Sequence, residues 1–186
     1  MVPKSACAGL LSFALVLGCG SKDATGTIST LQIDDFTTGT PLFQPGFATG
    51  EAAAVRLGPQ SAAFTVRKVL VLFGGGTATK TVTLTIYQDG DSTNPGAVLH
   101  NADYTLTASN AAIQEINVTL QNIHVAANQK IRVAVTFQHD GLPSVAVDSG
   151  RTASRTLLKL NSVGWTTAEA VGLLGDFVIR AEISTP

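Results

Sequence analysis

The stretch Thr81–Tyr87, TVTLTIY, places a threonine or an apolar residue at alternate positions. A period of two puts Val82, Leu84 and Ile86 on one face of an extended strand and the threonines on the other. A strand of this kind buries one face in a core and leaves the other near water, which is typical of antiparallel sheets. The segment therefore predicts a β-strand in a layered, all-β protein.

The same alternation recurs along much of the chain. Its clearest instances are Ile113–Leu120, Lys130–Gln138 and Phe177–Ser184. Phe64–Phe73 is almost continuously apolar, which suits a central strand with both faces buried. Shorter candidate strands are Thr27–Phe36, Ala52–Leu57, Val98–Leu106, Ser144–Val147 and Thr156–Leu160. About nine strands predict an all-β fold over residues 27–186, an antiparallel β-sandwich of the jelly-roll-like type.

Turn-forming residues punctuate these strands, and helical periodicity is weak. The run Gly74–Gly76 predicts a hairpin turn, because glycine adopts the backbone conformations that tight turns require. Thr166–Leu174 is the best candidate for a helix, and we expect only one helical turn there.

Residues 1–18 have the parts of a secretory signal peptide. Lys4 supplies a short positive region, and Ala6–Leu17 is an apolar run that is too short for a membrane span of ~20 residues. The run ends in Val16-Leu17-Gly18-Cys19, which resembles the lipobox of bacterial lipoproteins. An ordinary secretory peptide and an uncleaved anchor are the alternatives.

The lipobox resemblance implies a lipid anchor. In that family the leader is removed before the cysteine, so Cys19 becomes the lipid attachment site and residues 19–26 form the lipidated N-terminus and tether. Several acyl chains hold a protein far more firmly on a membrane than one chain does. Gly20 follows the cysteine in place of an aspartate, which by resemblance to enterobacterial sorting implies the outer membrane of the cell envelope.

Composition excludes several classes of function. Charged residues make up 13% of the chain, against about 25% in an average domain, and the net charge is −1. Nucleic-acid binding requires a basic stripe that neutralises phosphates, and no run of Lys or Arg occurs, so no nucleic-acid partner is expected. Both cysteines, Cys7 and Cys19, precede the predicted sandwich, which therefore has neither a disulfide nor a free thiol.

The loop that follows the strand Thr81–Tyr87 is rich in oxygen-bearing side chains. Asp89, Asp91, Thr93 and Asn94 begin like a calcium-binding EF-hand loop. Asn94 stands where that loop has glycine, and His100 stands where it has a bidentate glutamate. Asp-Gly and Asn-Pro-Gly are strong turn formers, so we interpret the loop as a structural turn. A calcium site completed by distant ligands and a partner-binding surface are the alternatives, and no metal or cofactor is predicted.

A wider pattern surrounds this loop. A strand that ends in Tyr87, the Asp/Gly loop, a Pro-Gly pair and a later Trp165 followed by Gly175–Arg180 resembles a recurring pattern in bacterial secreted β-sandwich domains. The resemblance covers roughly residues 50–184. It implies a surface module with this fold and implies no particular activity.

Catalytic motifs are absent from the sequence. The nucleophile motif G-x-S-x-G does not occur, and the histidines lack zinc-binding spacing. His139-Asp140 near Ser144 could be read as a triad, but Asp140 followed by glycine is better read as a turn. Three carboxylates, Glu51, Asp148 and Asp176, are candidates for glycoside hydrolysis. We expect them instead to form hydrogen bonds or ion pairs, with Asp176 or Glu51 paired with Arg56 or Arg180. The sequence therefore does not predict an enzyme.

Binding candidates are the few large aromatic residues. Trp165, Tyr104 and Tyr87 could stack on a sugar, whereas the alternative for Trp165 is a core position between the sheets. The sequence favours a noncatalytic, lipid-anchored surface module of the cell envelope that binds an envelope protein or a glycan through loops at one end of the sandwich. A carbohydrate-binding module is the alternative, and the lipid makes the membrane a second partner.

Overall fold

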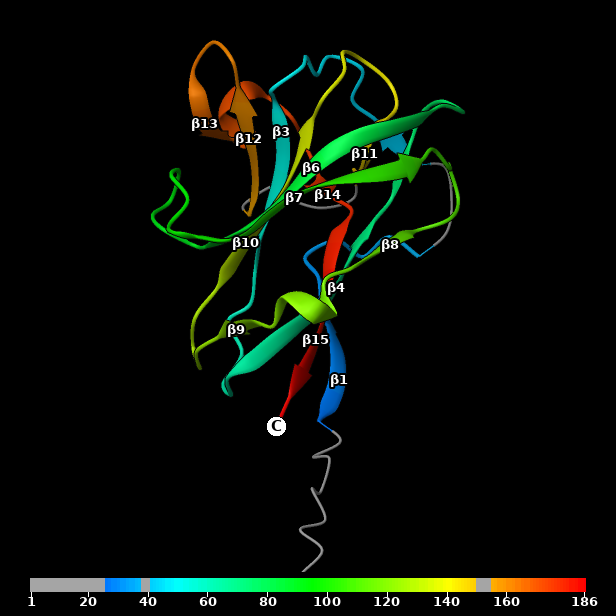
Figure 1. The fold of residues 1–186 in the computed structure, drawn as a ribbon. Helices are drawn as coiled ribbons and strands as arrows, with labels where there is room; N and C mark the ends of the chain where they lie inside the picture. Colours follow the sequence, from blue (N-terminus) through cyan, green and yellow to red (C-terminus); the bar gives the residue numbers. More distant parts are fainter. Residues whose placement is uncertain (1–25, 38–40, 150–154) are drawn as a thin grey trace, which may run out of the picture.

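The alternating segment forms part of β6 (Thr79–Gln88), which lies between β7 (Val98–Thr107) and β10 (Ile131–Phe137) in a six-stranded antiparallel sheet. The computed structural model describes residues 26–37, 41–149 and 155–186 (Figure 1). The predicted signal peptide (1–18), the lipid site Cys19 and the tether up to residue 25 lie outside the described residues.

The strands form two larger antiparallel sheets and a smaller one. The six-stranded sheet has the order β13-β12-β3-β10-β6-β7, with β3 (Ala52–Leu57), β12 (Thr156–Leu160) and β13 (Gly164–Thr167). The five-stranded sheet contains β1 (Thr27–Leu31), β15 (Ile179–Thr185), β4 (Phe64–Val71), β8 (Gln114–Asn117) and β9 (Ile123–Val125). The smaller sheet contains β2 (Leu42–Phe43), β5 (Phe73–Gly74), β11 (Ser144–Asp148) and β14 (Asp176–Phe177).

The prediction of an antiparallel β-sandwich is confirmed. The chain crosses between the two larger sheets at the β3–β4, β4–β6, β7–β8 and β9–β10 connections, and such repeated crossing is a feature of jelly rolls. The described residues contain fifteen strands, more than the expected nine or so. The additional strands are mostly two to four residues long, and segments of that length carry no measurable period in sequence.

The prediction of a hairpin at Gly74–Gly76 is wrong. β4 and β6 belong to different sheets, and Phe73 and Gly74 form β5, which pairs with β11. The glycines carry the chain from one sheet to the other. A Cβ atom at Gly74 would lie 2.5 Å from the carbonyl oxygen of Ser109, so the crossing requires glycine there for close packing. The expected helical turn in Thr166–Leu174 is confirmed as the 3-10 turn η2 (Glu169–Val171), and a second turn, η1 (Thr119–Gln121), follows β8.

The core lies between the inner faces of the two larger sheets. Val82, Leu84 and Ile86 of β6 are fully buried there, as the alternation predicted. Phe137 of β10 stacks on Phe47 at a ring-centroid distance of 4.4 Å. Each fully buried side chain of this size contributes roughly 1.5–3 kcal/mol through removal of apolar surface from water.

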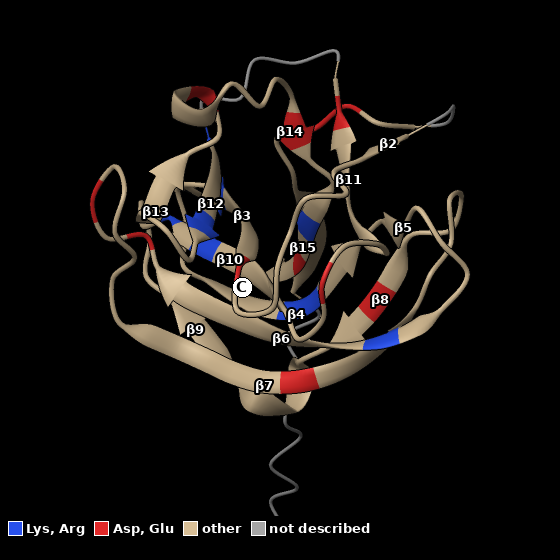
Figure 2. Ribbon diagram, turned by 90° about the horizontal axis from the view of Figure 1, so that it is seen from above, with Lys and Arg blue, Asp and Glu red and all other residues tan. Residues whose placement is uncertain are grey.

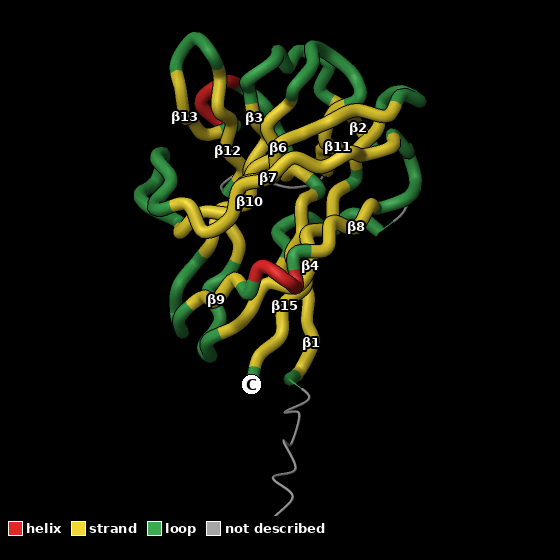
Figure 3. Tube along the Cα trace, in the orientation of Figure 1, coloured by secondary structure: helices red, strands yellow, loops and turns green. Residues whose placement is uncertain are grey.

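The two ends of the sandwich differ in which segments of the chain they contain. Gly26 lies beside Thr185, so the described chain starts and finishes at one end, which we call the proximal pole (Figure 1). The opposite end, the distal pole, gathers the loops at residues 44–51, 138–143 and 161–163 together with η2 (Figure 3).

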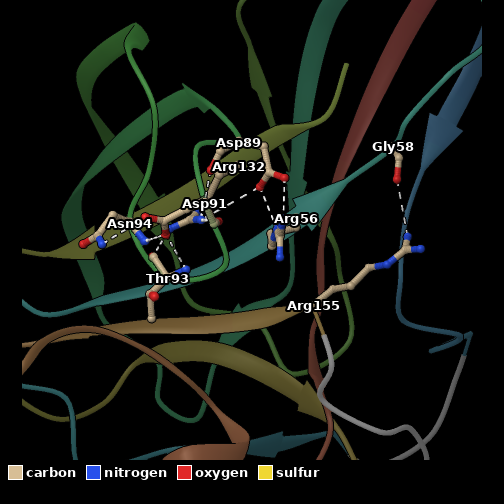
Figure 4. A network of polar contacts seen from close by, with 8 residues as sticks. All are labelled: Arg56, Gly58, Asp89, Asp91, Thr93, Asn94, Arg132 and Arg155. Carbon is tan, nitrogen blue, oxygen red and sulfur yellow. Dashed lines mark hydrogen bonds and ion pairs between the residues drawn. The ribbon is translucent and has the colours of Figure 1, made fainter. Parts of the chain in front are cut away.

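A buried arginine fixes the β6–β7 loop. Arg132 of β10 is completely inaccessible to solvent, and its guanidinium donates hydrogen bonds to three loop carbonyl oxygens (Figure 4). The distances to the oxygens of Asp89 and Asp91 are 3.0 and 3.1 Å, and the third acceptor is the carbonyl of Thr93. The carbonyls thus converge on a cation, as they do in a calcium loop, but the cation is a side chain of the protein itself.

Asp89 and Asp91 have different roles in this loop. Asp89 accepts a bidentate pair of hydrogen bonds from Arg56 of β3, at 2.7 and 2.6 Å. Asp91 is exposed and accepts the backbone N–H groups of Thr93 and Asn94, which lowers the pKa of its carboxyl group. Asp91 is therefore a local turn residue, whereas Asp89 joins the loop to the sheet.

This difference predicts unequal effects of two alanine substitutions on stability. Asp89→Ala removes a charge-assisted pair whose partners are 21% and 14% exposed, and it leaves Arg56 and Arg132 without their nearest carboxylate. We expect a loss of about 2 kcal/mol in the free energy of unfolding, between the values for exposed and buried pairs. Asp91→Ala should lose about 1 kcal/mol or less. Urea titration measures both values, and equal losses would contradict the distinct role of Asp89.

The position of Arg132 predicts that calcium leaves the melting temperature unchanged. A site with micromolar affinity would add about 2.7 kcal/mol at a hundredfold excess of calcium over Kd. Such a gain raises the melting temperature of a domain of this size by several degrees. Thermal melts with chelator and with millimolar calcium test this. A rise of more than about 3 °C that Asp91→Ala abolishes would establish a metal site.

Candidate functional site

A cleft opens at the distal pole between the 44–51 loop, β12 and η2. We call it the distal cleft, and its volume is about 280 Å³. Its apolar lining consists of Phe47, Leu158, Leu160, Val171 and Leu173, and the polar side chains Gln44 and Glu51 also line it. The volume is close to the lower end of small-molecule sites, which begin at roughly 300 Å³.

The apolar base of the cleft is an extension of the core. Phe47 is only 3% exposed, because its ring packs on Phe137 and lies 6.1 Å from the ring of Phe177. Leu158 faces the core from β12, where it is the register partner of Ala53. These side chains are fixed by core packing, so the base of the cleft is rigid.

Glu51 organises the edge of the cleft. One carboxylate oxygen accepts the N–H of Ala48 at 3.0 Å, and the other accepts the N–H of Asn161 at 3.0 Å. The side-chain amide of Asn161 in turn donates to the carbonyl oxygen of Thr49 at 3.1 Å. Glu51 therefore ties the 44–51 loop to the β12–β13 hairpin, which is a structural use of its charge.

Asp140 attaches a third loop to this assembly. Its carboxylate accepts the N–H and the hydroxyl of Thr49, at 2.7 and 2.9 Å, and these hydrogen bonds lower its pKa. The neighbouring His139 packs its ring edge-on against Phe73 and Phe137. Within the described parts of the chain, Nε2 of His139 and Oγ of Ser144 are buried without hydrogen-bond partners, so the two groups are not joined as a triad.

Three exposed apolar side chains lie on the loops and turns of the distal pole. Val163, Val171 and Leu174 are 64%, 47% and 75% exposed. Each directly precedes a turn glycine in the sequence, where the core does not require an apolar side chain. An exposed group of apolar side chains beside a cleft is a common feature of binding surfaces.

Two of the three carboxylates that are candidates for glycoside hydrolysis lie together, and the third lies apart from them. Asp148 and Asp176 are register partners on β11 and β14, and Asp176 accepts the hydroxyl of Thr156 at 2.6 Å. Glu51 belongs to the distal cleft, as described above. The expected pairing of Arg56 or Arg180 with Asp176 or Glu51 is wrong: Arg56 pairs with Asp89, and Arg180 pairs with the buried Asp34.

Two of the three candidate aromatic residues come together on the outer face of the six-stranded sheet. The rings of Tyr87 and Trp165 meet edge to face at 6.1 Å, although their strands are four spacings apart, which is about 19 Å in a flat sheet. The sheet must therefore curve toward this face. Fully buried alanines at positions 54 and 134 lie beneath the two rings, where a concave surface leaves little room.

Trp165 is neither a core residue between the sheets nor an open platform. The guanidinium carbon of Arg132 lies 5.4 Å from the centre of its ring, within the range of a cation–π interaction. Figure 2 shows the basic segments of β3 and β10 side by side in this region. One ring face of Trp165 is thus covered by the arginine that fixes the β6–β7 loop.

Tyr104 lies on the opposite face from the other two aromatic residues. Its register partner on β6 is the core residue Val82, and its hydroxyl is 3.0 Å from Nε2 of His100. Partial burial raises the pKa of Tyr104 and lowers that of His100. The three aromatic residues therefore do not form one binding surface.

The distal cleft was not found by sequence reasoning. Leu158 and Leu160 belong to a segment that reads as an ordinary strand, Leu173 to the expected helical turn, and the 44–51 loop carries no motif. The available signal was the placement of Val163, Val171 and Leu174 beside turn glycines, where a soluble protein has no structural need for them.

In the ranges that the structure describes, no three His, Cys, Asp or Glu residues are grouped so that they could hold a metal ion. The same ranges contain no helix that is long and apolar enough to span a membrane. No protein-family model, curated protein or solved structure matches this chain.

Proposed function

We propose that this chain is a noncatalytic, lipid-anchored module of the bacterial cell envelope, with its anchor in the outer membrane, that binds a protein partner through the distal cleft. The observation that carries the proposal is the position of a cleft with polar and apolar lining at the distal pole. This pole is opposite to the end where the described chain starts (Figure 1). An anchor and a binding site at opposite poles suit a protein that presents a surface away from a membrane.

The length of the tether strengthens this geometry. If Cys19 carries the lipid, seven residue steps separate it from Gly26, and an extended chain covers at most about 25 Å in that length. The proximal pole then stays within about 25 Å of the membrane, and the distal cleft lies at the end of the domain that is farther from the anchor. Loops that are attached to one another by Glu51 and Asp140 offer a partner a fixed surface.

The chemistry of the cleft favours a protein over a glycan. Of the two polar side chains that line it, Glu51 is already occupied by the N–H groups of Ala48 and Asn161, which leaves few groups to bind sugar hydroxyls. Its apolar side chains, with the exposed Val171 and Leu174, suit an apolar side chain of another protein. Glu51 and Glu169 add negative charge near the cleft, which complements a partner segment with a basic residue beside its apolar anchor.

The anchor is tested by Cys19→Ser in the full-length chain, expressed with its own leader in a bacterial host. The substitution removes the only thiol that the lipobox resemblance assigns to lipid. We expect no lipid attachment, and either an unprocessed precursor that keeps its apolar leader or a cleaved domain in the soluble fraction. A cleaved Cys19→Ser protein that still enters the detergent phase would contradict lipid attachment at this residue.

The distal cleft is tested by a photo-crosslinking side chain placed at position 171 in living cells. We expect one discrete adduct that Leu174→Glu reduces at least fivefold, because a buried charge opposes apolar docking. The matched control places the same crosslinker at Leu120, which is 95% exposed and lies on η1, away from the distal cleft. No adduct from position 171, or an equal yield of the same adduct from position 120, would refute the cleft as the binding site.

A further inference from the structure

A second surface feature lies on the flank of the sandwich, apart from the distal cleft. Two hollows of about 240 and 270 Å³ adjoin each other between the β6–β7 loop and the loop that precedes β10. They share Gln88, Gln129 and Lys130, so they form one elongated depression, which we call the flank groove. Each hollow alone is small, and together they suit a long, narrow ligand better than a compact one.

The flank groove has an apolar base and a polar rim. Val125 and Ile131 are buried and line its first section together with the half-buried Leu99. The rim contains three side-chain amides, those of Gln88, Asn128 and Gln129, and the ammonium group of Lys130. Among the described residues, these four side chains make no hydrogen bond or ion pair that would occupy them.

Both walls of the groove are held in place. The β6–β7 loop forms one wall through Asp89, Gly90 and Gly96, and Arg56 and Arg132 attach that loop to the sheet. A fully buried arginine carries a large desolvation penalty, so its presence beneath an exposed loop indicates that the position of the loop matters.

The other wall is fixed by main-chain hydrogen bonds. The N–H of Asn128 donates to the carbonyl oxygen of Gln60 at 2.7 Å, and the N–H of Gln129 donates to that of Ala126 at 3.2 Å. Asn128 itself has a left-handed backbone conformation, with φ of 61°. Two fixed walls that carry free amide groups form a binding surface that requires little ordering when a ligand arrives.

We propose that the flank groove binds an oligosaccharide chain. Amide side chains donate to and accept from sugar hydroxyl groups, and the apolar base can contact the C–H surface of the sugar rings. An extended peptide fits less well, because it binds by adding a strand to a free sheet edge. β6 and β10, whose ends contribute to the groove, already have both edges paired. β9 (Ile123–Val125), which also contributes to the lining, pairs only with β4, but its free edge is three residues long and offers a peptide few main-chain hydrogen bonds. The proposal does not depend on the protein-binding role of the distal cleft.

The test is calorimetric titration of the full-length protein in detergent with soluble hexasaccharides. The panel contains neutral β-linked and α-linked glucans, a xylan, a mannan and a chitin fragment, together with a galacturonan fragment. We expect at least one of them to bind with a Kd below about 1 mM. Gln88→Ala and Gln129→Ala should each weaken that binding about fivefold, which corresponds to the loss of one hydrogen bond of about 1 kcal/mol.

The control variant is Gln121→Ala, which removes an exposed amide on η1, outside the groove, and should leave the affinity unchanged. Lys130→Gln distinguishes an acidic from a neutral sugar ligand. It should weaken binding of the galacturonan fragment if the ligand is acidic, and it should have little effect on binding if the ligand is neutral. Equal melting temperatures exclude misfolding of the variants. Absence of binding across the panel, or equal binding by wild type and both groove variants, would overturn the proposal.

Discussion

The buried guanidinium of Arg132 is the group on which the arrangement of the β6–β7 loop and of Trp165 depends. An isolated charge in the interior is costly, and here the charge is stabilised by three carbonyl oxygens of one loop and by the nearby carboxylate of Asp89. Only Nε of the guanidinium is buried without a hydrogen-bond partner among the described residues. Burial lowers the pKa of Arg132, and the adjacent carboxylates of Asp89 and Asp91 oppose that shift. The loop and the arginine therefore require each other.

The same side chain connects three features that are distant in sequence. It fixes the β6–β7 loop, it covers one face of Trp165, and it fills the outer surface of a sheet that must curve for Trp165 to reach Tyr87. Small residues at positions 54 and 134 permit that curvature, because larger side chains on the inside of the bend would collide with the two rings. Chemistry that resembles a calcium loop thus serves to join two elements of the protein.

The sandwich could be predicted from the sequence because its longer strands alternate apolar and polar residues with a period of two. Val82, Leu84 and Ile86 occupy the buried face that their spacing implied, and a period of two admits no other regular structure. The short strands β2, β5 and β14 escaped prediction because two residues have no period. Gly74 was misread because a glycine that permits close packing and a glycine that permits a tight turn look alike in one sequence.

The candidate sites were less predictable, because each depends on partners that only the fold selects. Arg132 reads in sequence as the polar side of an alternating strand, and nothing local indicates that a loop forty residues away would enclose it. Glu51 and Asp89 likewise acquire their roles from Asn161 and Arg56, which lie on other strands or hairpins. Glu51, Asp89, Asp91 and Asp140 are thus occupied by structural contacts, whereas the side chains of Gln88, Gln129, Val171 and Leu174 remain available to a partner. In a protein whose polar motifs stabilise its own loops, binding surfaces are therefore to be sought among side chains that the fold leaves unused.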